Sequence, residues 1–229
     1  RLLWEVKSVG DNVAHDLRTP LNRLRALLYR VHQETRLEGV ERQMIDQALA
    51  ETDEMLTRFR ALQRIGEIER RDRQAFFEPV RLASVLEHVV ELHEPLAEDR
   101  GVALIADFAS DTPEVWADPA LLFEAVSNLV DNALKFTPHG GKVTVRLSLC
   151  EEGPRIVVSD NGPGVPADER EAVLQRFYRA HRTRAKPGSG LGLSIVAAIA
   201  RLHHFALSLD DAKPGLSVAL DCWRRGLDG

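Results

Sequence analysis

The sequence predicts an α+β protein in two parts: a helical hairpin, then a two-layer domain of helices and a mostly antiparallel sheet. Apolar residues recur at three- and four-residue steps through about the first 70 residues, the period of amphipathic helices. Further along, strand-like runs alternate with strongly periodic helical segments. We expect the hairpin over residues 1–72 and the second domain over residues 73–229.

The composition limits the class of protein. With 44% hydrophobic and 28% charged residues, the 229-residue chain is typical of a soluble globular protein with a sizeable core. A net charge of −5 argues against nucleic-acid binding driven by positive charge. Cys150 and Cys222 form no CxxC pair, so neither a disulfide framework nor a zinc site is predicted.

No signal peptide is recognisable, and no apolar run approaches the ~18 residues of a membrane-crossing helix. The chain starts at Arg1 with helical patterning almost from the first residue, so we expect it to be part of a longer protein.

The first predicted helix runs to about Gln33. On a wheel of about 100° per residue, His15 lies about 170° from the middle of an apolar seam and faces solvent with Thr19. Alone, this position fits an ordinary surface histidine. Pro20 removes a backbone donor and predicts a bend just after His15, either a hinge or a tolerated kink. The seam, a sector roughly 80° wide, consists of Val13, Leu17, Leu21, Leu24, Leu28 and Val31.

A second long helix is predicted from near Glu41, after a polar turn over 35–39. Two helices joined by a short loop form an antiparallel hairpin that cannot bury its apolar stripes alone. Pairing two hairpins into a four-helix bundle would bury them, so we expect a homodimer. The alternative is that the hairpin packs on the downstream domain of its own chain. The charged run 67–73 is predicted to be a linker.

In the second domain, Asp118 followed by Pro119 combines an N-cap with a favoured first helical residue and predicts a helix start. A turn is expected at Glu152-Gly153, and little regular structure between Asn161 and Gly190. Strands are predicted over 76–80, 102–108, 142–149, 155–159, 205–209 and 216–220, and further helices over 82–97, broken around Pro95, and from about 191 to 204.

The helix that follows Asp118 places Asn128 and Asn132 four residues apart on one face, with Lys135 close to the same side. Two amide oxygens suit a hard cation such as Mg²⁺, which takes its other ligands from water and nucleotide phosphates. Lys135 offers a point charge for phosphate. The alternative is an asparagine pair that caps or bridges neighbouring loops.

Asp160 directly follows a predicted strand, where a carboxylate can accept a hydrogen bond from an exocyclic amine such as that of adenine. Gly162 and Gly164 would let the backbone approach a flat base, although a simple turn has the same letters. Glycines at 188, 190 and 192 immediately precede a helix, where backbone N–H groups and the helix dipole favour an anion.

The intervening stretch is basic and lies between prolines and glycines, which suggests a mobile lid that neutralises a triphosphate or a merely solvated loop. Its charged and aromatic residues are Arg176, Phe177, Tyr178, Arg179, His181, Arg182, Arg184 and Lys186. Together, the amides, the lysine, the acid and the glycines describe a site for ATP and Mg²⁺.

These motifs resemble, in order, the five boxes of the catalytic core of bacterial sensor histidine kinases. The sequence from His15 to Leu21 (HDLRTPL) resembles the H box, and Asn128 to Thr137 (NLVDNALKFT) the N box. Asp160 to Gly164 is similar to the G1 box, Arg176 to Arg179 to the F box, and Gly188 to Leu193 to the G2 box. The resemblance implies a dimerisation and phosphotransfer hairpin followed by an ATP-binding sandwich of the gyrase/Hsp90/histidine-kinase type.

The resemblance implies that His15 receives the γ-phosphoryl group of ATP and passes it to an aspartate of a response regulator. Asp16 would act as general base or hold the tautomer of His15, and Thr19 would orient water if the protein also dephosphorylates its regulator. Asn128 and Asn132 would hold Mg²⁺. The implied nucleotide-binding residues are Asn128, Asn132, Lys135, Phe136, Asp160, Gly162, Gly164, Phe177, Tyr178, Arg179, Gly188, Ser189, Gly190, Leu191 and Gly192.

Two rival functions remain at this point: a nucleotide-binding dimeric scaffold with little kinase activity, and a free-standing ATPase. The ATPase is disfavoured because ATP-hydrolysing relatives carry a glutamate where this chain has Asn128. For the kinase we expect a homodimer, a receiver-domain partner and a cytoplasmic location without membrane contact by this part. The resemblance also allows a membrane anchor elsewhere in a longer protein.

Overall fold

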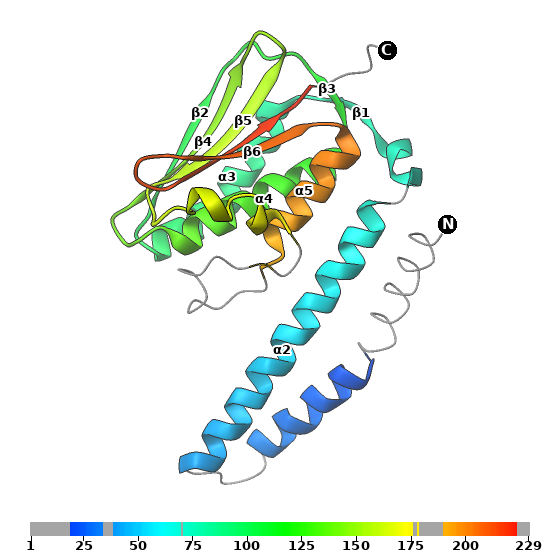
Figure 1. Cartoon of the computed structure of the whole chain (residues 1–229), viewed down its shortest axis with the longest axis vertical. Coiled ribbons are helices and arrows are strands. Elements are labelled where there is room, and N and C mark those ends of the chain that lie inside the picture. Colours follow the sequence, from blue (N-terminus) through cyan, green and yellow to red (C-terminus); the bar gives the residue numbers. More distant parts are fainter. Residues whose placement is uncertain (1–18, 34–38, 70, 176–177, 179–189, 224–229) are drawn as a thin grey trace.

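The computed structural model describes residues 19–33, 39–69, 71–175, 178 and 190–223. They form a helical hairpin and a two-layer domain in which helices cover one face of a five-stranded sheet, as the fold class predicts (Figure 1). Residues 19–33 are the first helix of the hairpin. The other helices are α2 (Gly39–Ile68), η1 (Arg71–Phe76), α3 (Leu82–Asp99), α4 (Pro119–Phe136), η2 (Ala167–Glu169), η3 (Ala172–Leu174) and α5 (Gly192–His203).

The main sheet has the strand order β2-β4-β5-β7-β6, in which only β2 and β4 run parallel. A separate antiparallel ribbon pairs β1 with β3. The strands are β1 (Glu78–Val80), β2 (Ala103–Phe108), β3 (Val115–Ala117), β4 (Lys142–Leu149), β5 (Pro154–Asp160), β6 (Ala206–Asp211) and β7 (Leu216–Asp221).

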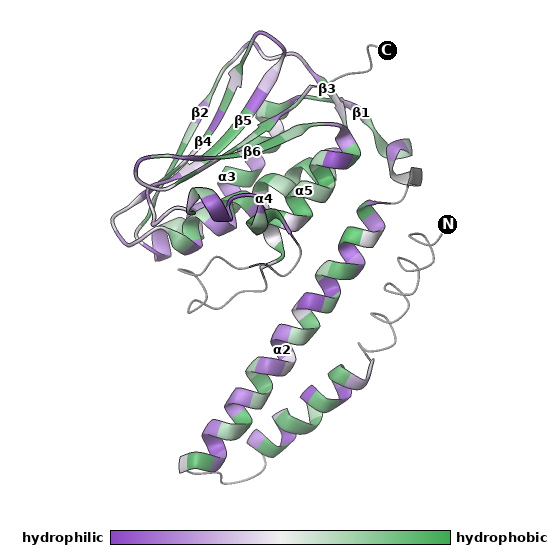
Figure 2. Ribbon diagram, in the orientation of Figure 1, coloured by the Kyte–Doolittle hydropathy of each residue, from purple (hydrophilic) through white to green (hydrophobic). Residues whose placement is uncertain are grey.

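The core lies between this sheet and the helices. Alternate residues of β4, among them Val143 and Val145, are fully buried, and Val145 pairs across the ladder with buried Val158 of β5. This alternation directs one face of the sheet toward the helix layer. Figure 2 shows that α5 is largely apolar, whereas polar and apolar residues alternate along α2.

Most predicted elements are present within a few residues of the expected bounds, but one expectation was wrong and one short strand was not predicted. Pro95 does not break its helix, because α3 continues to Asp99. Buried His93 and Ala97 flank the proline, and their packing compensates for the lost backbone bond. In the segment expected to be a linker, residues 67 and 68 are the last two of α2 and residues 71–73 are the first three of η1. The short strand β3 was not predicted, and its pairing with β1 gives it its structure.

The hairpin is antiparallel, and its register is shown by the close contacts Arg25–Asp53 (2.7 Å) and His32–Asp46 (3.1 Å). In this register Thr19 lies level with Phe59. The bend predicted between His15 and Pro20 lies outside the described residues. No described helix is both long and apolar enough to cross a membrane.

The C-terminal half of α2 packs on the chain's own second domain, chiefly on α5. Leu56, Ile65 and Ile68 are fully buried, whereas Val40 and Met44 at the other end of α2 are 71% and 65% exposed. Intrachain packing, the alternative raised from the sequence, therefore accounts for one half of α2. The other half leaves apolar side chains such as Val40 and Met44 exposed.

His203, the last residue of α5, contacts both the residue that precedes α4 and Phe77, which lies between η1 and β1. Its Nδ1–H donates to the carbonyl of Ile199 (2.8 Å), and Nε2 accepts from the backbone N–H of Asp118 (3.0 Å). The ring stacks on Phe77 with centroids 4.5 Å apart. Burial lowers the pKa of His203, so its neutral form supports the start of α4.

Candidate active site

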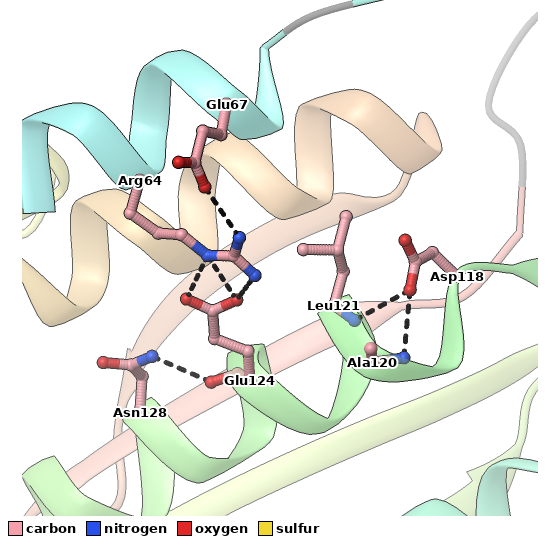
Figure 3. Close-up of polar contacts among 7 residues, drawn as sticks. All are labelled: Arg64, Glu67, Asp118, Ala120, Leu121, Glu124 and Asn128. Carbon is pink, nitrogen blue, oxygen red and sulfur yellow. Dashed lines mark hydrogen bonds and ion pairs between the residues drawn. The ribbon is translucent and has the colours of Figure 1, made fainter. Parts of the chain in front are cut away.

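Helix α4 carries the first group of predicted site residues, and its start is firmly defined. The Asp118 carboxylate accepts from the backbone N–H groups of Ala120 (3.0 Å) and Leu121 (3.1 Å), as expected of an N-cap (Figure 3). Eight apolar residues of α4 are buried, so the helix cannot rotate freely about its axis. Its opposite face therefore presents Asn128, Asn132 and Lys135 in a fixed arrangement.

The amide of Asn128 has a defined orientation. Its Nδ2 donates to the backbone carbonyl of Glu124 (2.8 Å), which turns Oδ1 toward the start of α5 (Figure 3). There, a Cβ added to Gly192 would lie 3.2 Å from Oδ1 of Asn128 and 2.9 Å from Nδ2 of Asn132. Glycine is required because any side chain would fill the space beside the two amides. Asn128 presents its amide oxygen to this space, whereas Asn132 presents its amide nitrogen. A half-turn of the Asn132 amide would place a second neutral oxygen there, and two such oxygens fit a hard cation such as Mg²⁺.

Asp160 closes β5 and is held from two directions. Its Oδ1 accepts from the backbone N–H of Gly162 (2.8 Å) and, more weakly, of Leu216 (3.4 Å). Oδ2 receives no hydrogen bond from the described residues. Burial raises the pKa of Asp160, and the two backbone donors oppose this shift. The carboxylate is therefore partly desolvated, with one oxygen left to accept a donor from a ligand.

Gly164 permits the close backbone approach predicted beside Asp160. Its φ of +66° is left-handed, and a Cβ there would lie 2.8 Å from the carbonyl oxygen of Gly215. The segment after β5 consequently lies against the start of β7, and Leu216 and Val218 of β7 line the same hollow as Asp160.

The start of α5 supplies anion-binding character. Leu191 is the N-cap residue, and its apolar side chain makes no cap bond to the first-turn N–H groups. Buried apolar residues of α5 fix its direction against the sheet. Its dipole and N–H groups accordingly favour negative charge beside Gly192.

These groups line one cavity of about 450 Å³. Ten residues that the sequence predicts to bind the nucleotide lie in its wall: Asn128, Asn132, Lys135, Phe136, Asp160, Gly164, Tyr178, Gly190, Leu191 and Gly192. Gly162 acts from outside the wall through its bond to Asp160. Thr19 is exposed on the hairpin. The predictions for His15, Asp16, Phe177, Arg179, Gly188 and Ser189 fall outside the described residues.

Three further polar residues line the cavity and had no predicted role: Thr57 of α2, Arg100 after α3, and Asp131 of α4. Asp131 lies between the two asparagines and four residues before Lys135, so its spacing could have indicated it. Thr57 and Arg100 belong to segments without a recognisable motif, and only the fold brings them to the cavity.

An ion-pair network fixes α2 beside this site. The guanidinium of Arg64 contacts both carboxylate oxygens of Glu124, with Nε 3.0 Å from each, and Nη1 donates to Glu67 (3.0 Å) (Figure 3). The hydrogen bond to Glu124 is the main cause of a raised Arg64 pKa. Glu124 is one turn before Asn128, so the hairpin is attached to the helix that carries the amides.

A two-layer sandwich in which an acid at a strand end, an asparagine-bearing helix and a glycine-rich helix start share one cavity is typical of the ATP-binding domains of gyrase, Hsp90 and histidine kinases. The family described as histidine kinase-, DNA gyrase B- and HSP90-like ATPase matches residues 117–222.

Comparisons with individual proteins narrow the class. MprB of Mycolicibacterium smegmatis, a signal transduction histidine-protein kinase/phosphatase, is 36% identical over 225 residues, 92% of this chain and 43% of MprB. A solved mycobacterial sensor histidine kinase MprB is 36% identical, with a TM-score of 0.56 over 62% of this chain and 95% of that one. Full-length ShkA in complex with AMPPNP is 26% identical, with a TM-score of 0.67 over 93% of this chain and 44% of ShkA.

The chain belongs to the bacterial two-component sensor histidine kinases and contains their catalytic core. It spans 43% of the length of the M. smegmatis relative.

Proposed function

We propose that this chain uses ATP to phosphorylate His15 and then passes the phosphoryl group to an aspartate of a response regulator. The observation that carries the proposal is the single cavity that joins Asp160, the α4 amides and the start of α5. The AMPPNP complex of ShkA, a structural relative, supports a nucleotide as the occupant.

Adenine recognition is assigned to Asp160. Because Oδ1 already accepts two backbone N–H groups, Oδ2 is the oxygen that would accept the exocyclic amine of adenine. Apolar neighbours such as Val158, Val173 and Leu216 line the same cavity and would cover the faces of the base.

Phosphate binding is assigned to Lys135 and to the first turn of α5. Asn128 would hold Mg²⁺ through the amide oxygen that faces Gly192, and Asn132 would do so after a half-turn of its amide that exchanges Nδ2 for the oxygen. The metal, when bound, supplies charge neutralisation and orients the β- and γ-phosphates. The protein groups keep the triphosphate extended from Asp160 toward the start of α5.

In the transfer step, an unprotonated ring nitrogen of His15 forms a bond to the γ-phosphorus while the bond to the ADP oxygen breaks. Asp16 would take the proton from the other ring nitrogen or fix its tautomer. Asn128, unlike a glutamate, cannot act as a base on water, which favours transfer to His15 over hydrolysis.

The hairpin register supports transfer of the phosphoryl group from the cavity to the acceptor motif, because both lie toward the same end of the hairpin. Thr19 belongs to the motif that contains His15 and is the first described residue of the hairpin. In the hairpin register it lies level with Phe59, two residues after Thr57 of the cavity wall. Thr19 is exposed, as a residue that orients water for regulator dephosphorylation would need to be. The kinase/phosphatase activity in the name of MprB supports this second activity.

We further infer a homodimer through the exposed apolar side chains of the hairpin, which include Leu24, Leu27 and Met44. The boundary between hairpin and ATP-binding domain is placed at residues 72 and 73. A cytoplasmic location follows from the proposed use of ATP and of a response regulator.

The test is incubation with γ-labelled ATP and Mg²⁺, followed by acid and base treatment of the protein. We expect acid-labile, base-stable label on the wild type, none on His15→Gln, and none on Asn132→Ala. His15→Gln should still bind ADP, because the groups proposed to bind the nucleotide, Asp160, Lys135 and the first turn of α5, are unchanged in this variant.

Other results would favour the rivals. Nucleotide binding without label on the wild type would indicate a scaffold, and ATP turnover without phosphoprotein would indicate an ATPase. Label that persists in His15→Gln would refute His15 as the acceptor.

A further inference from the structure

His93 and Asp131 form an ion pair at the edge of the cavity that the proposed function leaves unused. His93 is on α3, which packs against α4, and only 5% of it is exposed. Its Nε2 lies 3.4 Å from Oδ1 of Asp131, a residue of the cavity wall. The site thus contains a carboxylate where the proposed function places a polyanion.

The hydrogen bonds of His93 define its charge. Nδ1 lies 2.7 Å from the carbonyl of Val89, which can only accept, so Nδ1 carries a proton. Nε2 faces a carboxylate, which also accepts, so both ring nitrogens are protonated. The raised pKa of His93 has the bond to Asp131 as its largest cause, against burial. The imidazolium therefore neutralises Asp131.

The charged groups around Asp131 explain why its placement matters. Lys135 is four residues further on the same face of α4, the spacing at which an aspartate and a lysine attract each other. Arg100, just after α3, lines the cavity as well. A carboxylate without His93 would turn toward these cations and compete with phosphate for them.

We propose that His93 is a positioning residue that holds Asp131 on the α3 side of the cavity and cancels its charge, so that a triphosphate can bind beside it. The proposal rests on the proposed function, since it assumes that Lys135 faces phosphate. Under this proposal His93 affects the binding of the phosphates of ATP and makes no contact with the adenine base.

The experiment compares the Kd of MgATP with that of adenosine, the former by calorimetry and the latter by displacement. The variants are His93→Gln, which removes the charge but keeps a polar side chain, Asp131→Asn, and the double variant. His88→Gln is the matched control because His88 is exposed on the same helix. Thermal unfolding verifies that each variant is folded.

We expect His93→Gln to weaken MgATP about tenfold and adenosine less than about twofold, because an uncancelled charge acts on the phosphates. In the Asp131→Asn background, the same substitution should change neither Kd.

Equal losses for MgATP and adenosine would indicate a merely structural histidine and overturn the proposal. A loss that persists in the Asp131→Asn background, or no loss in His93→Gln, would also overturn it. Failure of the wild type to bind any adenine nucleotide would instead refute the proposed function itself.

Discussion

Replacement of Asp160 by asparagine tests the base-binding end of the cavity. The two backbone N–H groups that reach Oδ1 can only be satisfied by the oxygen of an asparagine amide. The NH₂ group must then occupy the place of Oδ2 and face the exocyclic amine of adenine, donor against donor. The variant therefore loses a charge-assisted hydrogen bond and gains a mismatch.

Loss of a hydrogen bond to a charged group amounts to about 1.5–3 kcal/mol, so we expect the Kd of ADP to rise about 10- to 150-fold. The stability of the fold should not fall with the affinity for ADP. Because the folded pKa of Asp160 is raised, its contribution to stability is full below the unfolded pKa and is lost as pH rises through the folded pKa. The variant should thus be as stable as the wild type at neutral pH, or more stable.

Calorimetric titration with ADP and chemical denaturation measure the two effects separately. Asp210→Asn is a suitable control, since Asp210 is an exposed carboxylate of β6. Retention of ADP affinity within about threefold would refute the assignment of adenine to Asp160, because a lost charged hydrogen bond cannot be that small.

Three further predictions address the amides, the hairpin and the base of α4. Gly192→Ala should abolish MgATP binding and weaken Mg²⁺-free adenosine binding far less in calorimetry, because a methyl group would displace Asn128 and Asn132; equal losses would contradict this. Arg64→Met should lower the free energy of unfolding by about 1–2 kcal/mol and speed hydrogen exchange in the C-terminal half of α2, since partly buried Glu124 loses its partner. Arg58→Met, which breaks the more exposed pair with Glu54, should change stability by less than about 0.5 kcal/mol, and similar losses for both would argue against a special role of Arg64. The lowered pKa of His203 makes its contribution to stability full above the unfolded pKa and lost as pH falls through the folded pKa. Denaturation between about pH 7.5 and about pH 5.5 should therefore show a smaller loss in His203→Gln than in the wild type, and identical slopes would exclude His203 as the source.

Local signals predicted much of the fold because they act locally in the structure as well. Asp118 and Pro119 start α4 through bonds within three residues, and the alternation in β4 follows from one-sided burial. Pro95 was misjudged since its cost is outweighed by packing of α3 against α4, which no local pattern reveals.

The residues of the candidate site likewise fall into those that a local motif predicts and those that only the packing of distant segments brings to the cavity. Asn128, Asn132 and Asp160 lie within motifs whose spacing reflects one helix face or one strand end, and they meet in the cavity as expected. Thr57 and Arg100 reach it only through the packing of α2 and the end of α3. The partnership of Asp131 with His93 joins residues on two helices and depends on how these helices cross.

The position of Thr57 has a thermodynamic consequence. Part of the nucleotide cavity wall belongs to the hairpin, so a nucleotide that binds the docked and undocked arrangements with different affinity must also shift the equilibrium between them. The relation is reciprocal: whatever factor a displacement of α2 imposes on the nucleotide Kd, the nucleotide imposes on the displacement of α2. A displacement of α2 would therefore be measurable as a change in nucleotide affinity, and nucleotide binding as a change in the packing of α2 on α5.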